Sequence, residues 1–228
     1  MVHSPAPDRQ EKIRIYTGLA ARTRLQELGV EQSEIEESVD YALRHWATCT
    51  RNDPPNYAGI TLYAKMLRGL RDRLRRRVEP WTNSNARNFA TVVHPSGSHA
   101  ITVSAGDSST GREDVTPWTR SEKGPAAHDA VTRNQLQPGF ELIEPSFLPF
   151  ALAAEPMQTW FLLHYVDLEA DEIRVELSLP ATINHEGYLT SWSERIVLDA
   201  RPLTPFHLDL GDRGDDDGDI DVPVGRRA

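Results

Sequence analysis

The feature of this sequence that most constrains its fold is a change of hydrophobic period near Trp81. Before Trp81, apolar residues recur at the spacing of one face of an α-helix. After Trp81 they alternate with polar residues, which is typical of a half-buried β-strand. Helices followed by strands favour an α+β fold over an alternating α/β fold. We therefore expect a helical region over residues 1–80 that packs as one unit with a sheet region over 81–208.

Three helices are predicted in the first region. The first covers residues 10–28. The second begins at Ser33, because Glu36 stands three residues further on and would complete a capping box. The third runs from 57 to 78 and ends before Pro80, since proline cannot continue a helix.

The second region predicts a mixed or antiparallel sheet with one short helix. Strands over 89–93 and 100–105 are joined by the turn-forming segment 95–98 and would form a hairpin. Their apolar positions share one parity, which gives the hairpin a single apolar face. Proline is common in the first turn of a helix, and Pro125 therefore predicts a short helix over 125–137.

Three further strands and a tail complete the prediction. Residues 160–166 are apolar at both parities, which indicates a central strand covered on both faces. Residues 173–179 alternate strictly and predict a half-exposed strand, and 188–199 predict a last strand with an interruption near Trp192. The Gly- and Asp-rich segment 209–228 predicts a disordered acidic tail.

The net charge of −9 conceals a separation of charge along the chain. Residues 1–80 carry 14 basic and 11 acidic side chains, whereas residues 141–208 carry 3 basic and 11 acidic ones. Guanidinium groups suit phosphate, so nucleic acid is one candidate ligand of the third helix. Pairing with the acidic C-terminal half or with a protein partner, and plain solvation, are the alternatives. The cations of this Arg-rich segment are Lys65, Arg68, Arg71, Arg73, Arg75, Arg76 and Arg77.

A second candidate binding region is the loop over 106–124, which has no hydrophobic period and many turn formers. Its hydroxyls, glycines and cations could cradle an anion together with the free N–H groups of a helix that begins at Pro125. Disorder is the alternative, because long aperiodic loops are usually either functional or disordered. The candidate residues of this polar loop are Asp107, Ser108, Ser109, Arg112, Arg120 and Lys123.

The same loop begins with a strand that runs into Gly106-Asp107-Ser108. Residues 101–108 resemble the first block of the GDSL or SGNH esterases, and this resemblance implies Ser108 as the nucleophile. That family takes its base from a late Asp-x-x-His, yet none of the histidines in the C-terminal half follows an Asp at that spacing. A serine needs an adjacent base to be activated, so no catalytic residue is assigned from the sequence.

The sequence gives little support for a metal site or for a membrane-spanning segment. His94 and His99 flank the hairpin turn and would face the same side, but a metal site needs a third or fourth ligand. We expect no metal and no cofactor. Cys49 is the only cysteine, no apolar run approaches the ~20 residues of a membrane span, and a cytoplasmic protein is expected.

These observations favour a non-catalytic binding or adaptor protein in a cytoplasmic complex. It would contact a protein partner, with nucleic acid as a second candidate, through the Arg-rich segment and the polar loop. The alternative is a small hydrolase that acts on an ester or a phosphorylated substrate at residues 104–124.

Overall fold

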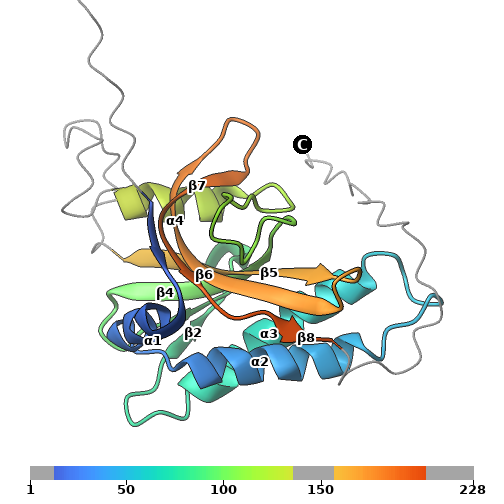
Figure 1. The fold of residues 1–228 in the computed structure, drawn as a ribbon. Helices are drawn as coiled ribbons and strands as arrows, with labels where there is room; N and C mark the ends of the chain where they lie inside the picture. Colours follow the sequence, from blue (N-terminus) through green and yellow to red (C-terminus); the bar gives the residue numbers. More distant parts are fainter. Residues whose placement is uncertain (1–12, 136–156, 204–228) are drawn as a thin grey trace, which may run out of the picture.

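The computed structural model of the chain describes residues 13–135 and 157–203, and the predicted tail over 209–228 lies outside these residues (Figure 1). The described elements, in chain order, are β1 (Arg14–Tyr16), α1 (Gly18–Glu27), α2 (Gln32–Trp46), α3 (Tyr57–Leu74), β2 (Thr82–Ser84), the 3-10 helix η1 (Ala86–Asn88), β3 (Thr91–Val93), β4 (His99–Ala105), α4 (Pro125–Gln135), β5 (Gln158–Asp167), β6 (Glu172–Ile183), β7 (Leu189–Val197) and β8 (Arg201–Pro202).

The strands form one mixed sheet in the order β1-β7-β6-β5-β4-β3-β2, with β8 paired to β6. Two of the described pairs are parallel, β1 with β7 and β4 with β5, and the others are antiparallel. The predicted α+β class is confirmed. The helical region and the sheet region also share one hydrophobic core.

One face of the sheet is covered by α1, α2 and α3 (Figure 1). Apolar residues at helical spacing place one stripe of each helix against the sheet, and burying each such side chain contributes about 1.5–3 kcal/mol. This helical face holds the larger core, which includes Leu25, Ile35, Val39, Leu43, Met66 and Leu70 from the helices and Ile101, Trp160, Leu162, Val175, Leu177 and Ile196 from the sheet.

The opposite face of the sheet carries α4 and a smaller core. Asn134, which is fully buried, fixes α4 to β5: its Nδ2 donates to Thr159 O over 3.1 Å, and its Oδ1 accepts from Thr159 N over 2.7 Å. The short helix predicted from Pro125 is confirmed within the described residues. The core beneath it consists of Ala127, Val131, Phe161, Leu163, Leu189 and Trp192.

The hairpin and the central strand are also confirmed. β3 and β4 pair antiparallel with Val92 opposite Ile101, and both residues lie in the core of the helical face. β5 lies between β4 and β6, and its neighbours Trp160 and Phe161 belong to the cores on opposite faces. The predicted interruption near Trp192 is a shift of register, since Leu179 pairs with Glu194 and Pro180 pairs with Trp192.

The prediction of a helix over 10–28 is wrong at its start. Residues 14–16 form β1, which pairs in parallel with β7 and places Ile15 opposite Arg195. Ile13 and Ile15 alternate with charged residues, and pairing with a strand distant in the sequence overrides the local helical preference. Residues 10–12 lie outside the described part of the chain.

Two predicted helix ends are also displaced. The capping box lies at Glu31 rather than Ser33, and Glu31 N donates to Glu34 Oε2 over 2.8 Å. A carboxylate is favoured there because the N-terminus of a helix carries partial positive charge. The third helix ends at Leu74, whose carbonyl accepts from Trp81 N over 3.3 Å, so the last arginines of the Arg-rich segment lie beyond it.

The prediction of a half-exposed β6 is wrong as well. Arg174, Glu176 and Ser178 alternate with the apolar residues as expected, yet they are only 5%, 0% and 0% exposed. The reason is that the loop over 106–124 covers this face of the sheet instead of leaving it to solvent. An alternating pattern thus marks a strand whose polar face is buried beneath a loop.

Candidate functional site

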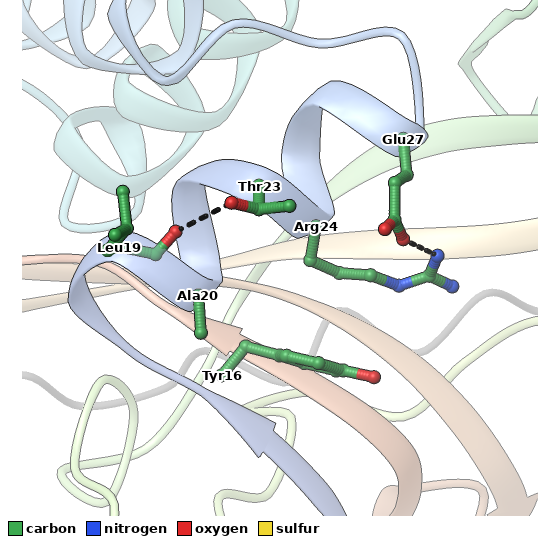
Figure 2. A pocket seen from close by; sticks show the side chains of 6 residues that line it. All are labelled: Tyr16, Leu19, Ala20, Thr23, Arg24 and Glu27. Atoms are coloured by element: carbon green, nitrogen blue, oxygen red, sulfur yellow. Dashed lines mark hydrogen bonds and ion pairs between the residues drawn. The ribbon is translucent and has the colours of Figure 1, made fainter.

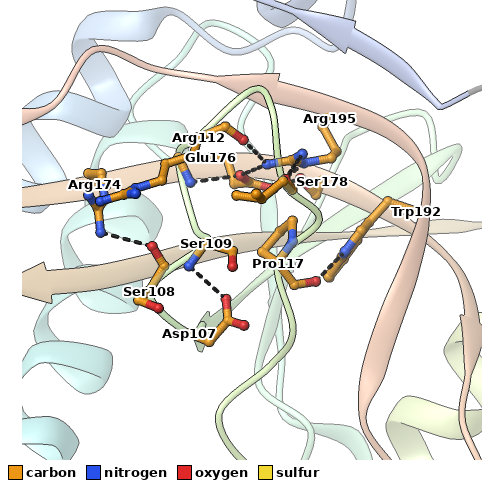
Figure 3. A network of polar contacts seen from close by, with 12 residues as sticks. Asp107, Ser108, Ser109, Arg112, Pro117, Arg174, Glu176, Ser178, Trp192 and Arg195 are labelled. Carbon is orange, nitrogen blue, oxygen red and sulfur yellow. Dashed lines mark hydrogen bonds and ion pairs between the residues drawn. The ribbon is translucent and has the colours of Figure 1, made fainter.

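The polar loop packs across β6 and β7 through backbone hydrogen bonds to buried side chains (Figure 3). Gly111 N donates to Glu176 Oε2 over 2.8 Å, and Arg174 Nη2 donates to Ser108 O over 3.0 Å. Trp192 Nε1 donates to the carbonyl of Pro117 over 2.8 Å. The interpretation of this loop as disordered is therefore wrong.

A fully buried ion pair lies beneath the loop (Figure 3). Arg195 Nη2 and Nε lie 2.6 and 3.0 Å from the two carboxylate oxygens of Glu176, and Ser178 Oγ donates to the same carboxylate over 2.7 Å. Two further guanidinium protons donate to the carbonyls of Arg112 and Val115 over 2.8 and 2.7 Å. Burying two charges is costly unless further hydrogen bonds satisfy them, and here the loop supplies those bonds.

Five of the predicted loop residues contribute to the structure of the loop. Asp107 Oδ1 accepts from Ser109 N over 3.1 Å. Ser108 and Arg112 offer their carbonyls to the arginines of β6 and β7. Arg120 N donates to Ala105 O over 3.0 Å and returns the loop to the end of β4. Of the predicted loop side chains, that of Lys123 is the one the structure directs to a cavity.

Lys123 is held at the end of the loop by both its backbone and its side chain. Lys123 N donates to Gly187 O over 2.8 Å. Its Nζ donates to Ser104 Oγ over 2.9 Å and to Ser121 Oγ over 3.2 Å. Ser104 lies on β4, is 7% exposed, and donates its own hydroxyl hydrogen to Ala105 O over 3.2 Å.

The side chain of Lys123 is half-buried, and no acidic side chain of the described residues forms an ion pair with its ammonium. Burial lowers the pKa of Lys123 to about 8, because removal from water disfavours the charged form. The neighbouring strand contributes His164, whose pKa is lowered to about 4 by burial and by the charges of Lys123 and Arg120. No described group hydrogen-bonds to His164 Nε2.

Ser104 and Lys123 line a cavity of about 400 Å³. One wall is the first turn of α4, where Pro125, Ala126 and Ala127 line the cavity. The N–H groups of a first helical turn lack partners within the helix and attract negative charge. The other lining residues are Tyr63, Arg87, Asn88, Phe89, Ala90, Thr102, Val103, Glu122, Gly124 and Phe161.

The rim of this cavity is held in an unusual backbone conformation. Arg87 and Asn88 have φ values of 55° and 60°, in the left-handed region that is unfavourable for residues with side chains. Such residues persist where the surrounding structure holds them, and they gather at functional sites. The side chain of Arg87 forms an ion pair with Asp129 of α4 and so links the rim to the opposite wall.

Several arginines of the Arg-rich segment are already paired with other groups of the chain. Arg71 Nη2 donates to Thr91 O over 2.7 Å and to Ser84 O over 2.8 Å, which fixes the edge strand β2 and its neighbour β3. Arg71 is therefore a structural residue of the sheet edge.

Two more of these arginines pair with acids of α2. Arg73 lies 2.8 Å from Glu37, and Arg77 lies 2.6 Å from Glu34. Arg73 and Arg77 thus form ion pairs within the chain, as one of the alternatives predicted. The predicted partner, the acidic C-terminal half, is wrong for these two residues. The reason is that α2 and α3 pack side by side, so their charged flanks meet. Glu194 of the C-terminal half instead pairs with arginines of β1 and α1.

Four cations of the Arg-rich segment remain at or near the surface. Arg68, Arg75 and Arg76 are exposed and Lys65 is half-buried. Arg68 lies 3.5 Å from the exposed Asp72, a contact of small energetic value. The surface open to a partner is therefore smaller than the sequence predicts.

A second hollow of about 570 Å³ lies beside β1 and α1 (Figure 2). Its polar side chains pair with neighbouring groups: Thr23 Oγ1 donates to Leu19 O over 3.1 Å, and Arg24 contacts Glu27 over 2.7 Å (Figure 2). Tyr16 and Ala20 complete a largely apolar lining. This hollow therefore presents few polar groups that could bind or activate a ligand.

The two hairpin histidines lie on the same side, as predicted. Their rings stack with centroids 4.6 Å apart, and both contact Trp81 edge-on. His99 Nε2 donates to Leu28 O over 2.9 Å, and burial lowers the pKa of His99 to about 4. Across residues 13–135 and 157–203, no three His, Cys, Asp or Glu side chains gather closely enough to hold a metal ion.

Comparisons with protein-family models, with curated proteins and with solved structures give no match for this chain. In the described part of the chain, no helix is both long enough and apolar enough to cross a membrane. The cavity at Lys123 must accordingly be interpreted from its own chemistry. Sequence reasoning selected Lys123 but missed Ser104, although the position of Ser104 in β4, opposite in parity to Val103, places it on the face that the loop covers.

Proposed function

We propose that this chain is a binding protein whose cavity at Lys123 takes an anionic group, a carboxylate or a phosphate, of a protein partner. The observation that carries the proposal is the half-buried ammonium of Lys123, which among the described residues contacts the hydroxyls of Ser104 and Ser121. A buried charge is costly unless it is paired. An incoming anion would supply the missing countercharge.

The surroundings of Lys123 suit such a group. Ser104 and Ser121 offer hydroxyls beside the ammonium, and the first turn of α4 contributes its partial positive charge. The aromatic rings of Phe89 and Phe161 also line the cavity. The ligand that fits best is therefore an anionic group joined to an apolar body, as in an acidic or phosphorylated peptide that also carries an apolar side chain.

A protein partner fits better than nucleic acid. A duplex needs a row of free cations along its phosphates, and Arg71, Arg73 and Arg77 are occupied within this chain. A single cavity that mixes one cation with aromatic walls instead recognises one group at a time. We expect the complex to form in the cytoplasm, in keeping with the single cysteine.

Calorimetric titration of the full chain with phosphate, with acetate, and with a phosphoserine peptide and its unphosphorylated form tests the proposal. We expect measurable binding of the anions at pH 7 and at least about tenfold weaker binding by Lys123→Met, which removes the charge at similar volume. Lys65→Met is the matched control, because it removes a lysine from the Arg-rich segment, and it should bind as the parent does. Equal affinities of the parent and Lys123→Met would refute the proposal.

The source of the anion follows from the same titrations. Tighter binding of the phosphorylated peptide indicates a phosphate on the partner, and equal binding of both peptides indicates a carboxylate. A lysate pull-down with and without nuclease, in parallel with Lys123→Met, then shows whether nucleic acid takes part. Loss of all partners on nuclease treatment would overturn the assignment to a protein partner.

A further inference from the structure

We propose that Ser104 and Lys123 also form a nucleophile and general-base pair that cleaves an ester bound in the cavity. This activity goes beyond the binding function, because it uses the neutral form of Lys123, whereas anion binding uses the charged form. The two proposals can therefore fail separately. The nucleophile differs from Ser108, which the esterase resemblance implied.

The geometry of the pair carries the proposal. A serine is activated by a base within hydrogen-bonding distance, about 2.6–3.2 Å. Lys123 Nζ lies 2.9 Å from Ser104 Oγ, and both residues line the same cavity. For Ser108, the polar contact that the structure provides is at its carbonyl, which accepts from Arg174.

The position of Lys123 favours its neutral form at mildly alkaline pH. Its side chain is largely withdrawn from water, and desolvation lowers the pKa of a buried lysine. The second hydroxyl, that of Ser121, fixes the direction of the amine. A lysine tuned in this way serves as base for a serine in proteins that have no Ser-His-Asp triad.

The charged and titratable groups around the pair lie in the loop, on β5 and on the rim. Arg120 lies in the loop and His164 on β5, and the charges of Arg120 and Lys123 act on the buried His164. Arg87 on the rim is paired with Asp129. Glu122 also lines the cavity. The lowered pKa of Lys123 therefore comes from its removal from water.

The reaction is an acyl transfer followed by hydrolysis. The hydroxyl of Ser104 turns from Ala105 O to the neutral Nζ of Lys123, which takes its proton as Oγ bonds to the carbonyl carbon of the ester. The bond from that carbon to the alcohol oxygen breaks, and Lys123 returns the proton to the departing alcohol. Water then attacks the acyl-serine and gives a proton to Lys123, which passes it to Oγ as the acid leaves.

The cavity also supplies groups for the carbonyl and the acyl chain. The oxyanion that forms during attack is negative and needs an N–H donor; at the start of α4, Pro125 has no N–H and His128 N donates to Gly124 O over 3.2 Å. Ala127 N already donates to Gly124 O over 2.9 Å, so Ala126 N is the candidate donor on this wall. Phe89 and Phe161 would contact an apolar acyl chain.

Labelling with a fluorophosphonate, which bonds covalently to activated serines, tests the proposal on the full chain. We expect one label per chain, mapped to Ser104 by peptide mass analysis, and a labelling rate that rises with pH through about 8. Ser104→Ala should lose the label, and Lys123→Met should label at least about 100-fold more slowly. Ser33→Ala, on the exposed start of α2, is the control and should label as the parent does.

Lys123→Arg separates the two proposals, because arginine keeps the positive charge but is not deprotonated near neutral pH. It should still bind phosphate and should not be labelled. Thermal melting of each variant establishes that it is folded. No label on the parent, a label on Ser108, or equal labelling of the parent and Lys123→Met would each overturn the catalytic proposal. Loss of phosphate binding in Lys123→Arg with labelling retained would overturn both roles assigned to the lysine.

Discussion

The two faces of the sheet are buried by different means. On the helical face, α1, α2 and α3 cover a large apolar core, and their ion pairs lie at its margin. On the loop face, α4 covers a small core, and the rest is a loop laid over charged and hydroxyl side chains. Both faces exclude water, but they bury charge differently: the loop face holds a fully buried ion pair, whereas on the helical face the buried Glu194 pairs with the partly exposed Arg24.

This difference separates the requirements of stability from those of function. An apolar face gains free energy from burial itself and tolerates modest change. A polar face gains little from burial and depends on each hydrogen bond being made. On the loop face that condition is met for Glu176, whereas the half-buried ammonium of Lys123 contacts hydroxyl groups among the described residues. The candidate site lies at Lys123, where this charge has no acidic partner among the described residues.

The largest effect is expected where the buried ion pair is broken. Glu176→Ala removes the partner of Arg195, which is 1% exposed, and leaves its charge buried. We expect the free energy of unfolding to fall by about 3–5 kcal/mol. Urea denaturation followed by circular dichroism measures this change.

Replacing both partners provides the control for this experiment. Arg195→Met combined with Glu176→Leu removes both charges at similar volume, and such replacements are often neutral. Most of the lost stability should return in the double variant. If Glu176→Ala were as stable as the parent, the ion pair would not secure the loop face, and the contrast between the two faces would fail.

The second prediction concerns pH and the buried lysine. Lysine in the unfolded chain has a pKa of 10.5, against about 8 for Lys123 in the folded chain. Between these values the unfolded state still holds a proton that the folded state has released, so the free energy of unfolding rises with pH. The rise amounts to about 3 kcal/mol and is complete above the unfolded value.

Lys123→Met isolates this contribution from other alkaline titrations. The variant should be more stable than the parent below pH 8, and the difference should shrink as the pH rises from 8 to 10.5. Urea denaturation of both proteins at several pH values measures it. A stability difference that stays constant over this range would show that Lys123 is not held in a water-poor site.

The sequence predicts most of the fold because hydrophobic period reports burial directly. The stripes of α2 and α3, the hairpin and the central strand β5 all follow from the spacing of apolar residues. β1 does not, since three residues acquire strand geometry only by pairing with β7, almost the whole chain away. The burial of Glu176 and Ser178 also cannot be predicted from the hydrophobic period. A polar residue in an alternating pattern is predicted to be exposed, whether water or a loop covers it.

The candidate site is less accessible to sequence reasoning for the same reason. Lys123 stood out as one cation in a polar loop, but its partner Ser104 lies 19 positions away and reads as an ordinary polar position of a strand. The cavity needs η1, β4, the loop and α4 together, and no local pattern reports how these meet. The parity of Ser104, opposite to that of Val103, is the sequence signal that could have placed it on the correct face.

The smallest effect is expected for the ion pairs of the helical face, and it completes the comparison. Glu37 lies 2.8 Å from Arg73 but is 63% exposed, so water screens the pair and both side chains lose freedom on pairing. We expect Glu37→Ala to lower the free energy of unfolding by less than about 1 kcal/mol, and less still in 1 M salt.

Denaturation of Glu37→Ala at low and high salt, beside Glu176→Ala under the same conditions, measures both effects. Glu176 is fully buried, so salt should leave its larger contribution nearly unchanged. A loss in Glu37→Ala as large as that in Glu176→Ala would mean that charges stabilise both faces alike. A small, salt-sensitive loss would instead show that an exposed ion pair of the helical face contributes little beside the buried ion pair of the loop face.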